Sequence, residues 1–474
     1  MALEDTIIKQ QNKHQIPFRL IEKGFFFINE NSIQYLWKMS QTIKTQDSIL
    51  NKLGIAKLNA MQNEAQLAIS SSSDIVLLSP TGTGKTLAFL LPILADLNPN
   101  IEEVQALIVA PSRELAIQIE QVLREMGSGY KTSVVYGGRL FSKDKIDLKH
   151  RPAILVGTPG RIADHIQRDS FKTSTIKTLV LDEFDKSLEV GFEKEMTTIC
   201  KSLPKLEKKI LTSATQKARV PKFVGLKDPV YVNYLKEVES QLKVKGIISP
   251  SKDKMETLVS ALDHLGNQPG IVFCNFKESI HRLSEYLTDN NINHGCFYGG
   301  MEQKERERAL IKFRNGTHQL LIATDLAARG IDVPEIKFIL HYHLPLRKQE
   351  FTHRNGRTAR MNKEGIAYVL HWTEEKLPDF IGTLETEKLT QILPPETTHK
   401  TTLFISGGRK DKISKGDIAG LFFKQAGLVG DELGTIELKQ DCAFVSVPTE
   451  KYKEIIEKLN NTKLKKRKIR VTKI

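Results

Sequence analysis

The sequence has few cysteines and no long apolar run. Its four cysteines, Cys200, Cys274, Cys296 and Cys442, lie far apart in 474 residues and form neither a Cys-x-x-Cys pair nor a His-Cys metal spacing. The sequence therefore predicts neither a disulfide framework nor a zinc site, and reduced thiols in the cytoplasm are expected. No stretch is apolar enough to span a bilayer, and the first thirty residues lack the apolar core of a signal peptide. We expect a cytoplasmic protein without a membrane partner.

The chain carries an excess of positive charge. Its net charge is +14 and its pI is near 9.3, which suits a polyanionic partner because cationic surfaces release counterions from phosphates. Charge alone does not separate RNA from DNA or from an anionic membrane surface. With 40% hydrophobic and 27% charged residues the chain should fold, and its length predicts roughly three domains.

Two long segments have the alternation of a parallel α/β fold. Short apolar runs alternate with amphipathic stretches, which predicts sheets covered on both faces. In residues 39–232 the expected strands are Ile75–Leu78, Ala106–Val109, Ser133–Tyr136, Ile154–Val156, Leu179–Leu181 and Ile210–Leu211. In residues 246–376 they are Ile271–Phe273, His294–Phe297, Leu320–Ala323, Phe338–Leu340 and Ile366–Leu370. A polar linker, 233–245, joins the two segments, so a cleft that opens and closes is expected.

Two shorter segments flank this pair. After a linker at 377–399 that contains a Pro-Pro pair and several Thr, residues 400–474 read strand, helix, strand, strand, helix, strand, which predicts a small α+β domain. This segment has 17 Lys or Arg against 9 Asp or Glu, so it holds more than half of the net charge. Residues 1–38 have no clear periodicity, and we interpret them as an accessory extension or an over-extended start before Met39.

The sequence Ser79-Pro-Thr-Gly-Thr-Gly-Lys-Thr86 is typical of a phosphate-binding loop. It lies between an expected strand and a helical run, so backbone N–H groups would face phosphate while Lys85 adds charge and Thr86 an oxygen for Mg²⁺. Ser79 stands where the general pattern has its first Gly. The alternative is a chance Gly-rich turn, which the strand and helix around it disfavour.

A second motif, Leu179-Val-Leu-Asp-Glu-Phe-Asp185, places acids at the end of another strand. Asp182 can hold Mg²⁺ there, and Glu183 can orient an attacking water. Alone this motif reads equally well as a solvated turn. With the loop upstream it predicts nucleotide hydrolysis.

Further motifs follow in a fixed order. They are Pro111-Ser-Arg-Glu-Leu-Ala116, Gly137-Gly138, Thr158-Pro-Gly-Arg161, Ser213-Ala-Thr215, Ala323-Thr-Asp325 with Ala328-Arg-Gly-Ile-Asp332, and His353-Arg-Asn-Gly-Arg-Thr-Ala-Arg360. With the two motifs above, this set over about residues 50–375 resembles that of the DEAD-box RNA helicases. The resemblance implies two tandem RecA-like parallel-sheet domains and an ATP-dependent RNA helicase that uses ATP and Mg²⁺.

The resemblance also implies roles at the ATP site. The ATP-binding residues would be Gln62, Thr81, Gly82, Thr83, Gly84, Lys85, Thr86 and Asp332, with Thr86 and Asp182 holding Mg²⁺ largely through water. The catalytic residues would be Lys85, Asp182, Glu183, Arg357 and Arg360, and the residues that couple hydrolysis to closure would be Asp185, Ser213, Thr215 and His353. Arginines on the second lobe neutralise phosphoryl charge only on closure, so closure would gate hydrolysis.

Loops and helix starts in the same series would contact RNA. The residues implied are Pro111, Arg113, Glu114, Gly137, Gly138, Thr158, Pro159, Gly160, Arg161, Thr324 and Asp325. Glycines and helix N-termini allow close approach to phosphates, so this core would hardly read sequence. Outside the series each of these short motifs reads as a turn.

Two positions depart from the family pattern. Phe184 replaces a small residue, so its ring must find room behind the metal site, but the acids remain and ATP hydrolysis is expected. Residues 53–62 resemble the family's Q motif, in which the Gln62 amide would pair with adenine. The aromatic residue usual upstream is Thr45 here, and an exposed helix position is the alternative for Gln62.

Residues 400–474 resemble the RRM-like βαββαβ RNA-binding domain of DbpA-type helicases. The matching positions are Leu403–Lys410, Gly416–Ile418, Gly427, Gly434–Ile436 and Phe444–Val445. RRM sheets stack bases on aromatic residues, and few stand at the expected sites, so basic residues are expected to hold RNA. They are Arg409, Lys410, Lys412, Lys465, Lys466, Arg467, Lys468 and Arg470. The alternative is a solvated charge run at the tail.

The sequence thus predicts a monomeric ATP-dependent RNA helicase. The resemblance implies a hairpin of large-subunit ribosomal RNA as its anchor, with pre-ribosomal particles as partners during ribosome assembly. One alternative is an ATP-binding RNA clamp or scaffold with little turnover, for which Phe184 is the suspicious feature. Another is a DNA translocase, although the spellings at 158–161 and 213–215 favour RNA.

Overall fold

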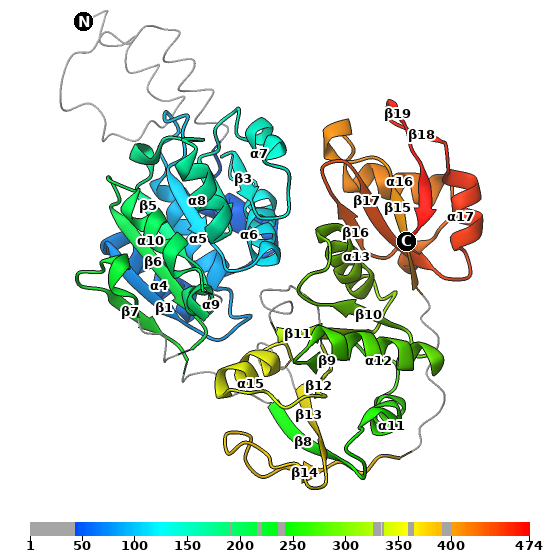
Figure 1. The fold of residues 1–474 in the computed structure, drawn as a ribbon. Coiled ribbons are helices and arrows are strands. Elements are labelled where there is room, and N and C mark those ends of the chain that lie inside the picture. The colour runs from blue at the N-terminus through cyan, green and yellow to red at the C-terminus, as the bar shows by residue number, and fades with distance from the viewer. Residues whose placement is uncertain are drawn as a thin grey trace, which may run out of the picture.

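The structure, a computed structural model, contains three sheet-based units, which we call lobe 1, lobe 2 and the C-terminal domain (Figure 1). It describes residues 43–189, 191–215, 220–235, 242–325, 333, 336–358, 365–390 and 400–474. The expectations for residues 1–38, Asp332 and Arg360 lie outside these ranges. Within them no helix combines the length and the hydropathy needed to cross a membrane.

Lobe 1 is a parallel sheet with the strand order β3-β4-β2-β5-β6-β1-β7. The strands are β1 (Asp74–Leu78), β2 (Ala106–Val109), β3 (Thr132–Val135), β4 (Ile154–Gly157), β5 (Thr178–Leu181), β6 (Lys208–Ser213) and β7 (Val230–Asn233). The helices are α3 (Gln46–Leu53), α4 (Ala60–Ser71), α5 (Lys85–Asp96), α6 (Arg113–Met126), α7 (Phe141–Asp147), α8 (Pro159–Gln167), α9 (Phe184–Glu189) and α10 (Glu193–Lys201). Ile75 and Leu77 of β1 face one apolar cluster and Val76 and Leu78 the other, so the strand is buried on both faces.

Lobe 2 repeats this plan with the strand order β10-β11-β9-β12-β13-β8-β14. The strands are β8 (Leu242–Ser249), β9 (Gly270–Cys274), β10 (His294–Phe297), β11 (Leu320–Thr324), β12 (Phe338–His341), β13 (Gly365–Trp372) and β14 (Glu385–Thr386). The helices are α11 (Met255–Leu265), α12 (Lys277–Asp289), α13 (Gln303–Arg314) and α15 (Lys348–Asn355). All its strand pairs are parallel, so the predicted pair of RecA-like parallel sheets is confirmed.

The second sheet extends beyond the predicted range 246–376 at both ends. Strand β8 begins at Leu242, inside the predicted linker 233–245, and β14 lies after residue 376. The alternation Leu242-Lys-Val-Lys245 resembles a polar linker, but pairing with β13 over eight residues makes it a strand. A polar sequence with a period of two is compatible with a strand whose partner supplies the hydrogen bonds.

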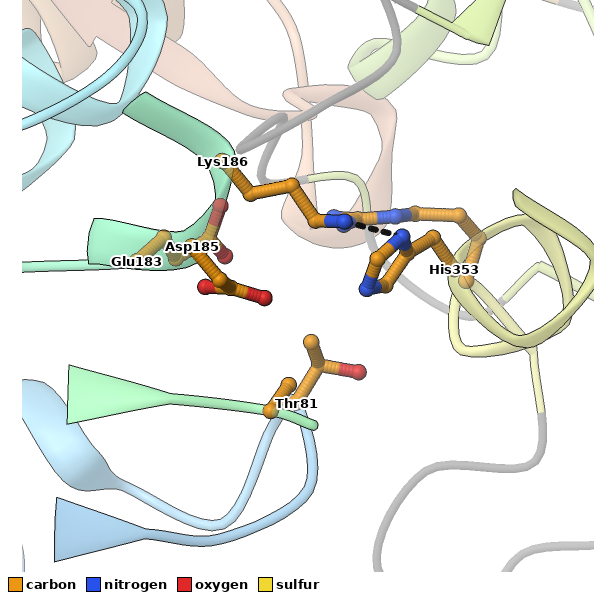
Figure 2. Close-up of a pocket in the computed structure, with 7 residues that line it drawn as sticks. Thr81, Glu183, Asp185, Lys186 and His353 are labelled. Atoms are coloured by element: carbon orange, nitrogen blue, oxygen red, sulfur yellow. Dashed lines mark hydrogen bonds between the residues drawn. The ribbon is translucent and has the colours of Figure 1, made fainter. Parts of the chain in front are cut away.

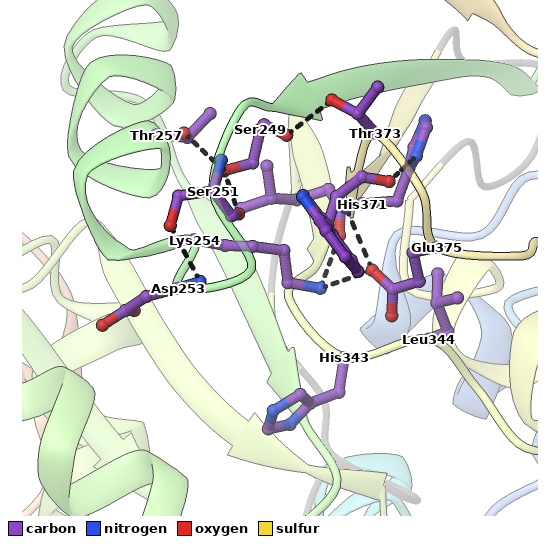
Figure 3. Close-up of polar contacts among 12 residues, drawn as sticks. Ser249, Ser251, Asp253, Lys254, Thr257, His343, Leu344, His371, Thr373 and Glu375 are labelled. Atoms are coloured by element: carbon purple, nitrogen blue, oxygen red, sulfur yellow. Dashed lines mark hydrogen bonds and ion pairs between the residues drawn. The ribbon is translucent and has the colours of Figure 1, made fainter.

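A buried lysine lies at the end of β13 in the lobe 2 sheet (Figure 3). Lys254 is 6% exposed, and its Nζ donates to the Leu370 carbonyl at 3.0 Å and to the Glu375 carboxylate at 3.2 Å. The same carboxylate accepts the Trp372 backbone N–H at 3.0 Å. Lys254 therefore fixes the turn that follows β13.

The C-terminal domain has the predicted βαββαβ order. Its antiparallel sheet runs β16-β17-β15-β20, from β15 (Lys400–Ile405), β16 (Ile436–Leu438), β17 (Ala443–Pro448) and β20 (Val471–Lys473). Helices α16 (Lys415–Lys424) and α17 (Tyr452–Leu459) cover its apolar face, and a hairpin of β18 (Lys463–Leu464) and β19 (Arg467–Lys468) precedes the last strand. Four 3₁₀ turns complete the described elements: Thr173–Thr175, Lys222–Val224, Arg409–Asp411 and Gly430–Glu432.

Candidate functional site

The loop after β1 has the conformation that a phosphate-binding turn needs. Gly82 and Gly84 have φ values of 84° and 87°, a region that favours glycine, and α5 starts directly after them. The Lys85 Nζ donates to the Ser79 carbonyl at 2.5 Å and to the Pro80 carbonyl at 2.7 Å. Burial lowers the pKa of Lys85, and the nearby Glu183 and Asp182 oppose that shift. The loop thus holds a cation beside two acids at a helix N-terminus.

The acidic end of β5 faces this loop. Asp182 is 4% exposed, and the Thr212 hydroxyl donates to its carboxylate. Burial and the neighbouring Glu183 raise the pKa of Asp182 to about 6. Glu183 has a φ of 46°, unusual for a residue other than glycine, and its N–H donates to the Thr212 hydroxyl at 3.1 Å. Phe184, the departure from the family pattern, is fully buried in an apolar cluster of lobe 1, so its ring finds room in the core behind the two acids.

Two hydroxyls connect the acids to the end of β6. The Thr215 Oγ1 donates to Asp185 Oδ2 at 3.0 Å, and the Thr215 N–H donates to the Ser213 Oγ at 2.9 Å. The Ser213 carbonyl in turn accepts the Ser79 N–H at 3.1 Å. This chain of contacts joins the phosphate-binding loop, the acids and the end of β6.

Lobe 2 supplies the opposite wall of the same site (Figure 2). The Thr81 Oγ1 donates to the Gly356 carbonyl at 2.9 Å, and Lys186 of α9 donates to the His353 Nδ1 of α15. A Cβ on Gly356 would stand 2.9 Å from the Thr81 Oγ1, so the close approach depends on glycine there. Two segments 275 residues apart in sequence are therefore in direct contact.

A small pocket lies where the lobes meet. Its lining residues are Thr81, Glu183, Asp185, Lys186, Ala214, His353 and Arg357. Arg357 is 6% exposed and comes from lobe 2, whereas the acids come from lobe 1. The Asp185 Oδ1 and His353 Nε2 are buried without a hydrogen-bond partner within the described ranges. The structure thus brings the predicted Thr81, Glu183, Asp185, His353 and Arg357 together in one pocket.

Gln62 is buried against the phosphate-binding loop, so the alternative of an exposed helix position is wrong. It is 7% exposed, and its Nε2 donates to the Gly84 carbonyl at 3.3 Å. Its Oε1 accepts the Asn59 N–H at 3.0 Å, which completes a capping box at the start of α4. Thr45, which stands in the aromatic position, caps α3 by accepting the Ser48 N–H.

The predicted RNA-contacting helix start at Pro111 to Glu114 lies against lobe 2. Arg113 Nη1 donates to Gln303 Oε1 at 3.2 Å, and Arg306 Nε donates to Glu114 Oε1 at 2.8 Å. The side chains of Arg306 and Glu114 are only 11% and 8% exposed. The first turns of α6 and α13 therefore form a polar contact between the lobes.

The two glycines at 137 and 138 lie beside that contact. Gly138 has a φ of 83°, and a Cβ there would stand 2.6 Å from the Arg113 Nη1. A side chain at this position would displace Arg113. The glycine pair and the start of α6 thus form one surface.

Thr158 and Pro159 begin α8, but the Arg161 side chain turns inward. Its Nε donates to the buried Asp144 at 2.7 Å and its Nη2 to the Arg139 carbonyl at 2.7 Å. A Cβ added to Gly160 would meet no atom of another described residue within 4 Å, so the start of the helix is open to close approach. The geometry favours contact through this backbone and gives the Arg161 guanidinium a positioning role.

Asp325, which was predicted together with Thr324 to contact RNA, forms an ion pair with Arg354. Arg354 has a fully buried side chain that donates Nε to Asp325 Oδ1 at 2.7 Å and Nη2 to Oδ2 at 2.5 Å. Arg354 also binds the Asn275 Oδ1 at 2.7 Å. The loop after β11 is therefore fixed to the loop after β9.

Most of the basic residues predicted to hold RNA on the C-terminal domain are exposed. The exposed ones are Lys410, Lys412, Lys465, Lys466, Lys468 and Arg470. Arg467 forms an ion pair with Asp411, Lys465 reaches Asp417 at 2.7 Å, and Arg409 starts a 3₁₀ turn. Two aromatic residues stand on the inner strands of the sheet: Phe404 on β15 lies opposite Phe444 on β17, with ring centroids 5.7 Å apart.

The sequence did not single out several residues at the site. Gln303 and Arg306 share one face of α13 at a spacing of three, but within Gln303-Lys-Glu-Arg-Glu-Arg308 that spacing looks like an ordinary charged surface. Lys186 and Thr212 likewise gain their partners only through tertiary contacts. No local signal distinguishes such residues.

Among the described residues, no group of three or more His, Cys, Asp or Glu side chains is placed to hold a metal ion. Asp182 and Glu183 nevertheless supply hard carboxylate oxygens beside the phosphate-binding loop. A magnesium ion held mainly by water and phosphate oxygens needs only one or two such groups.

Family models match most of the chain. The DEAD/DEAH box helicase model covers residues 59–223, the helicase conserved C-terminal domain 253–362, and the DbpA RNA binding domain 402–473. The chain is 30% identical over 440 residues to the ATP-dependent RNA helicase DbpA of Escherichia coli (strain K12), an alignment that covers 89% of this chain and 95% of that protein. DbpA of Bacillus subtilis (strain 168) is 29% identical over 467 residues, which is 90% of this chain and 96% of that protein.

Solved structures agree with the fold. The Saccharomyces cerevisiae Dbp5 structure bound to RNA and ADP BeF3 matches with a TM-score of 0.62 and 27% identity, over 70% of this chain and 88% of that one. These matches agree with the two lobes, the pocket between them and the C-terminal sheet. The chain belongs to the DEAD-box family of ATP-dependent RNA helicases and has the DbpA type of RNA-binding domain.

Proposed function

We propose that ATP hydrolysis in the pocket between the lobes remodels large-subunit ribosomal RNA during ribosome assembly. The observation that carries the catalytic part is that acids from lobe 1 and Arg357 from lobe 2 line one pocket. A site divided in this way is complete only when the lobes approach. ATP turnover is then coupled to the conformation that grips RNA.

Lys85 has to change partners to bind phosphate. Its Nζ now donates to the Ser79 and Pro80 carbonyls of its own loop. A phosphate oxygen carries more charge than a carbonyl and binds an ammonium more strongly, so the β- and γ-phosphates can draw Lys85 off the loop. Gly82, Gly84 and the start of α5 would leave N–H groups facing the same phosphates.

The acids fit a bound Mg²⁺. Asp182 is buried and held by Thr212, so its carboxylate is oriented, and Thr86 lies in the first turn of α5. When bound, Mg²⁺ would neutralise charge on the phosphate oxygens. Glu183, next to Asp182 and on the wall of the pocket, would orient the attacking water.

Contacts across the pocket would couple hydrolysis to closure. Asp185 accepts from Thr215, and Lys186 meets His353 from the other lobe. Arg357 would supply positive charge to the transferring phosphoryl group, with Arg360 and Asp332 completing the set from the family pattern. Closure and phosphoryl transfer would therefore require each other.

The Glu183 assignment is tested by Glu183→Gln. Loss of the carboxylate should lower RNA-stimulated ATP hydrolysis by about 10² or more while ATP binding persists. Glu193→Gln, an exposed acid on α10, is the matched control and should hydrolyse ATP normally. A Glu183→Gln protein with normal turnover would remove the proposed role.

A clamp with little turnover was suggested by Phe184 alone. The ring is fully buried in the apolar core, and the acids remain beside Lys85. This arrangement supports turnover. It removes the structural reason for preferring the clamp.

The ribosomal substrate is proposed from the C-terminal domain. The matching RNA-binding model covers residues 402–473, and the two DbpA relatives align over nearly their whole lengths. Six of the eight basic residues predicted to hold RNA on this domain are exposed, where phosphates can reach them. We place the enzyme in the cytoplasm as a monomer, which sedimentation of the purified chain would test.

Crosslinking to total cellular RNA followed by sequencing tests this substrate. The full chain should give crosslinks concentrated in one region of large-subunit ribosomal RNA. Lys466→Glu/Lys468→Glu should disperse them, while Lys424→Glu, an exposed lysine on α16, should not. Equal scatter for all three proteins would contradict a ribosomal anchor.

A further inference from the structure

Lobe 1 contains a buried carboxylate that binds side chains from two neighbouring segments. Asp144 of α7 is 0% exposed. Its Oδ2 accepts the Arg161 Nε at 2.7 Å and lies 3.2 Å from the His165 Nε2, and both partners belong to α8. Its Oδ1 lies 3.1 Å from the Nη1 of Arg139, which precedes α7. We call Arg139, Asp144, Arg161 and His165 the α7–α8 cluster.

An aromatic ring packs against the same cluster. Phe141 of α7 stacks on the His165 ring, with centroids 4.4 Å apart and an interplanar angle of 20°. The guanidinium carbons of Arg161 and Arg168 lie 5.0 Å and 4.6 Å from the centroid of the Phe141 ring. Cation–π contacts of this kind add to the ion pairs. Ring stacking and charge together therefore fix α7 against α8.

The α7–α8 cluster connects two backbone segments that the sequence predicts to contact RNA. Arg139 directly follows the glycine pair at 137–138, and Arg161 ends the segment 158–161 at the start of α8. The Arg161 Nη2 donates to the Arg139 carbonyl at 2.7 Å, while its Nε binds Asp144. One guanidinium group therefore joins the buried carboxylate to the end of the glycine segment.

A backbone contact ties the same two segments at the end of the sheet. The Thr158 N–H donates to the Val135 carbonyl, in the last residue of β3, at 3.2 Å. A Cβ on Gly157 would stand 2.5 Å from that carbonyl oxygen, so the close approach depends on glycine there. Strand β3 is the edge strand of the lobe 1 sheet. The α7–α8 cluster adds a second link beyond the end of this edge strand.

Asp144 is the group that keeps two guanidinium groups together at this depth. The side chains of Arg139 and Arg161 are only 24% and 12% exposed. Without the carboxylate these two cations would repel each other where water screens them poorly. The His165 Nδ1 is buried without a hydrogen-bond partner among the described residues, so a second ring N–H would have no acceptor there. The ring is therefore neutral and donates its Nε2–H to Asp144.

We propose that Asp144 is a positioning residue for RNA binding. Through Arg139 and Arg161 it sets the separation of the glycine pair and the start of α8, so that the backbone N–H groups of both segments meet RNA phosphates together. Asp144 itself is buried and does not touch RNA. This inference deepens the proposed function and rests on the proposed contacts of these two segments with RNA.

Asp144→Asn tests the proposal through the sign of its effect. Loss of a negative charge near a polyanion site would by itself tighten RNA binding. Positioning predicts the opposite, because the uncharged amide no longer holds both guanidinium groups. The affinity of the full chain for a fluorescein-labelled oligouridine, measured with a non-hydrolysable ATP analogue, should fall about tenfold.

Asp147→Asn is the matched control. Asp147 is an exposed carboxylate on the same helix and also pairs with Arg139, but it does not reach α8. An exposed ion pair contributes little, so this variant should bind the oligouridine within about twofold of the wild type. Normal or tighter RNA binding by Asp144→Asn, or an equal loss in both variants, would overturn the positioning role.

Kinetics distinguish positioning from general damage to lobe 1. In RNA-stimulated ATP hydrolysis, Asp144→Asn should raise the RNA concentration for half-maximal rate about tenfold, while kcat at saturating RNA stays within about threefold of the wild type. The affinity for the ATP analogue without RNA should not change. A fall in kcat at saturating RNA with an unchanged half-maximal concentration would contradict a role in RNA binding.

Arg161→Lys gives a second variant that does not depend on the folding of Asp144→Asn. It keeps the positive charge but loses the fork that binds Asp144 and the Arg139 carbonyl at once. RNA affinity should again fall about tenfold, and the double variant Asp144→Asn/Arg161→Lys should be within about twofold of the weaker single variant. Wild-type affinity in Arg161→Lys, or additive losses in the double variant, would overturn the joint action of the cluster.

Gly160→Asp separates a failure of this proposal from a failure of the proposed RNA contact. A Cβ at Gly160 has open space within the described structure, and an acid suits the first turn of a helix. If RNA phosphates meet the start of α8, this carboxylate should weaken binding about tenfold by repulsion. Weak binding by Gly160→Asp with normal binding by Asp144→Asn would remove the positioning role alone. Normal binding by both variants would remove the RNA contact and the positioning role with it.

Discussion

Lobe 1 and lobe 2 have the same strand order but use the junction after the first strand differently. In lobe 1, β1 leads through Ser79–Gly84 into α5, with two glycines at positive φ. In lobe 2, β8 leads through residues 250–254, which contain no glycine, into α11. Both junctions carry a lysine at the start of the helix, Lys85 and Lys254.

The difference lies in what holds each lysine. Lys254 binds a carboxylate and a carbonyl at the end of β13, the strand that corresponds to β6 in lobe 1. Lys85, by contrast, binds two carbonyls of its own loop. A phosphate can displace neutral carbonyls, whereas Lys254 already has an anionic partner. The lysine at this position is therefore suited to bind a ligand in lobe 1 and to stabilise the fold in lobe 2.

The largest effect should follow from Lys85→Met. Removing the cation that meets the β- and γ-phosphates should reduce ATP hydrolysis by about 10² or more. The melting temperature should stay within a few degrees, because the hydrogen bonds lost are those to the Ser79 and Pro80 carbonyls rather than to a carboxylate. Steady-state hydrolysis with saturating RNA, combined with calorimetry, gives both numbers, and a marked loss of stability would erase the contrast with lobe 2.

Lys254→Met should have the opposite profile. It leaves the Leu370 carbonyl and the Glu375 carboxylate without their shared donor, so lobe 2 should lose about 1–3 kcal/mol of unfolding free energy. ATP hydrolysis at a temperature where the protein is folded should remain within a few-fold of normal. Hydrogen exchange of β13 and β8 measures the stability of lobe 2 directly. Unchanged protection of these strands in the variant would show that Lys254 does not stabilise the lobe.

A double-mutant cycle on Glu114 and Arg306 tests the contact between the lobes. The pair is largely buried, so a coupling free energy of about 1 kcal/mol is expected in RNA affinity measured with a non-hydrolysable ATP analogue. Glu114→Ala, Arg306→Ala and the double variant supply the cycle. Additive losses would mean that each residue acts on RNA separately.

The smallest effect near neutrality should come from histidines in lobe 2. Burial lowers the pKa of His318 to about 4, of His341 to about 3 and of His343 to about 4. These groups stay neutral in the folded lobe and take up protons on unfolding below about pH 6.5, so their contribution to stability is present above that pH and is lost progressively as the pH falls toward 4. Hydrogen exchange corrected for intrinsic rates should show that β12 is less protected at pH 5.5 than at pH 7.5. Equal protection of β12 at the two pH values would contradict this prediction.

The sequence predicted most of the fold because the buried parallel strands are apolar runs. Ala106–Val109, Ile154–Gly157 and Thr178–Leu181 are buried at every position, so each stands out in the sequence. Strands β7, β8 and β14 escaped because half or more of their residues face solvent or are polar. Their identity comes from pairing partners, which a local pattern does not contain.

The features of the site also divide into those that the sequence predicted and those that depend on tertiary contacts. Ordered motifs located the loop at 79–86, the acids and Arg357, and the structure places Thr81 of that loop, Glu183, Asp185 and Arg357 around one pocket. The inward turn of Arg161 and the burial of Gln62 depend on Asp144 and Gly84, residues distant in sequence. The contacts of Thr402 and Ser446 with Thr317 and Asn315 of lobe 2 could not be predicted either, because Thr402 and Ser446 are small polar residues whose partners lie in another unit.

The central claim is that one ATP site is completed by two lobes, and Arg357→Ala measures it most directly. Single-turnover hydrolysis with saturating RNA should fall by about 10³ or more, the scale of a lost arginine finger. The affinity of a fluorescent ATP analogue without RNA should change less than about threefold, because lobe 1 holds the phosphates. RNA-stimulated hydrolysis at the normal rate in this variant would contradict the account.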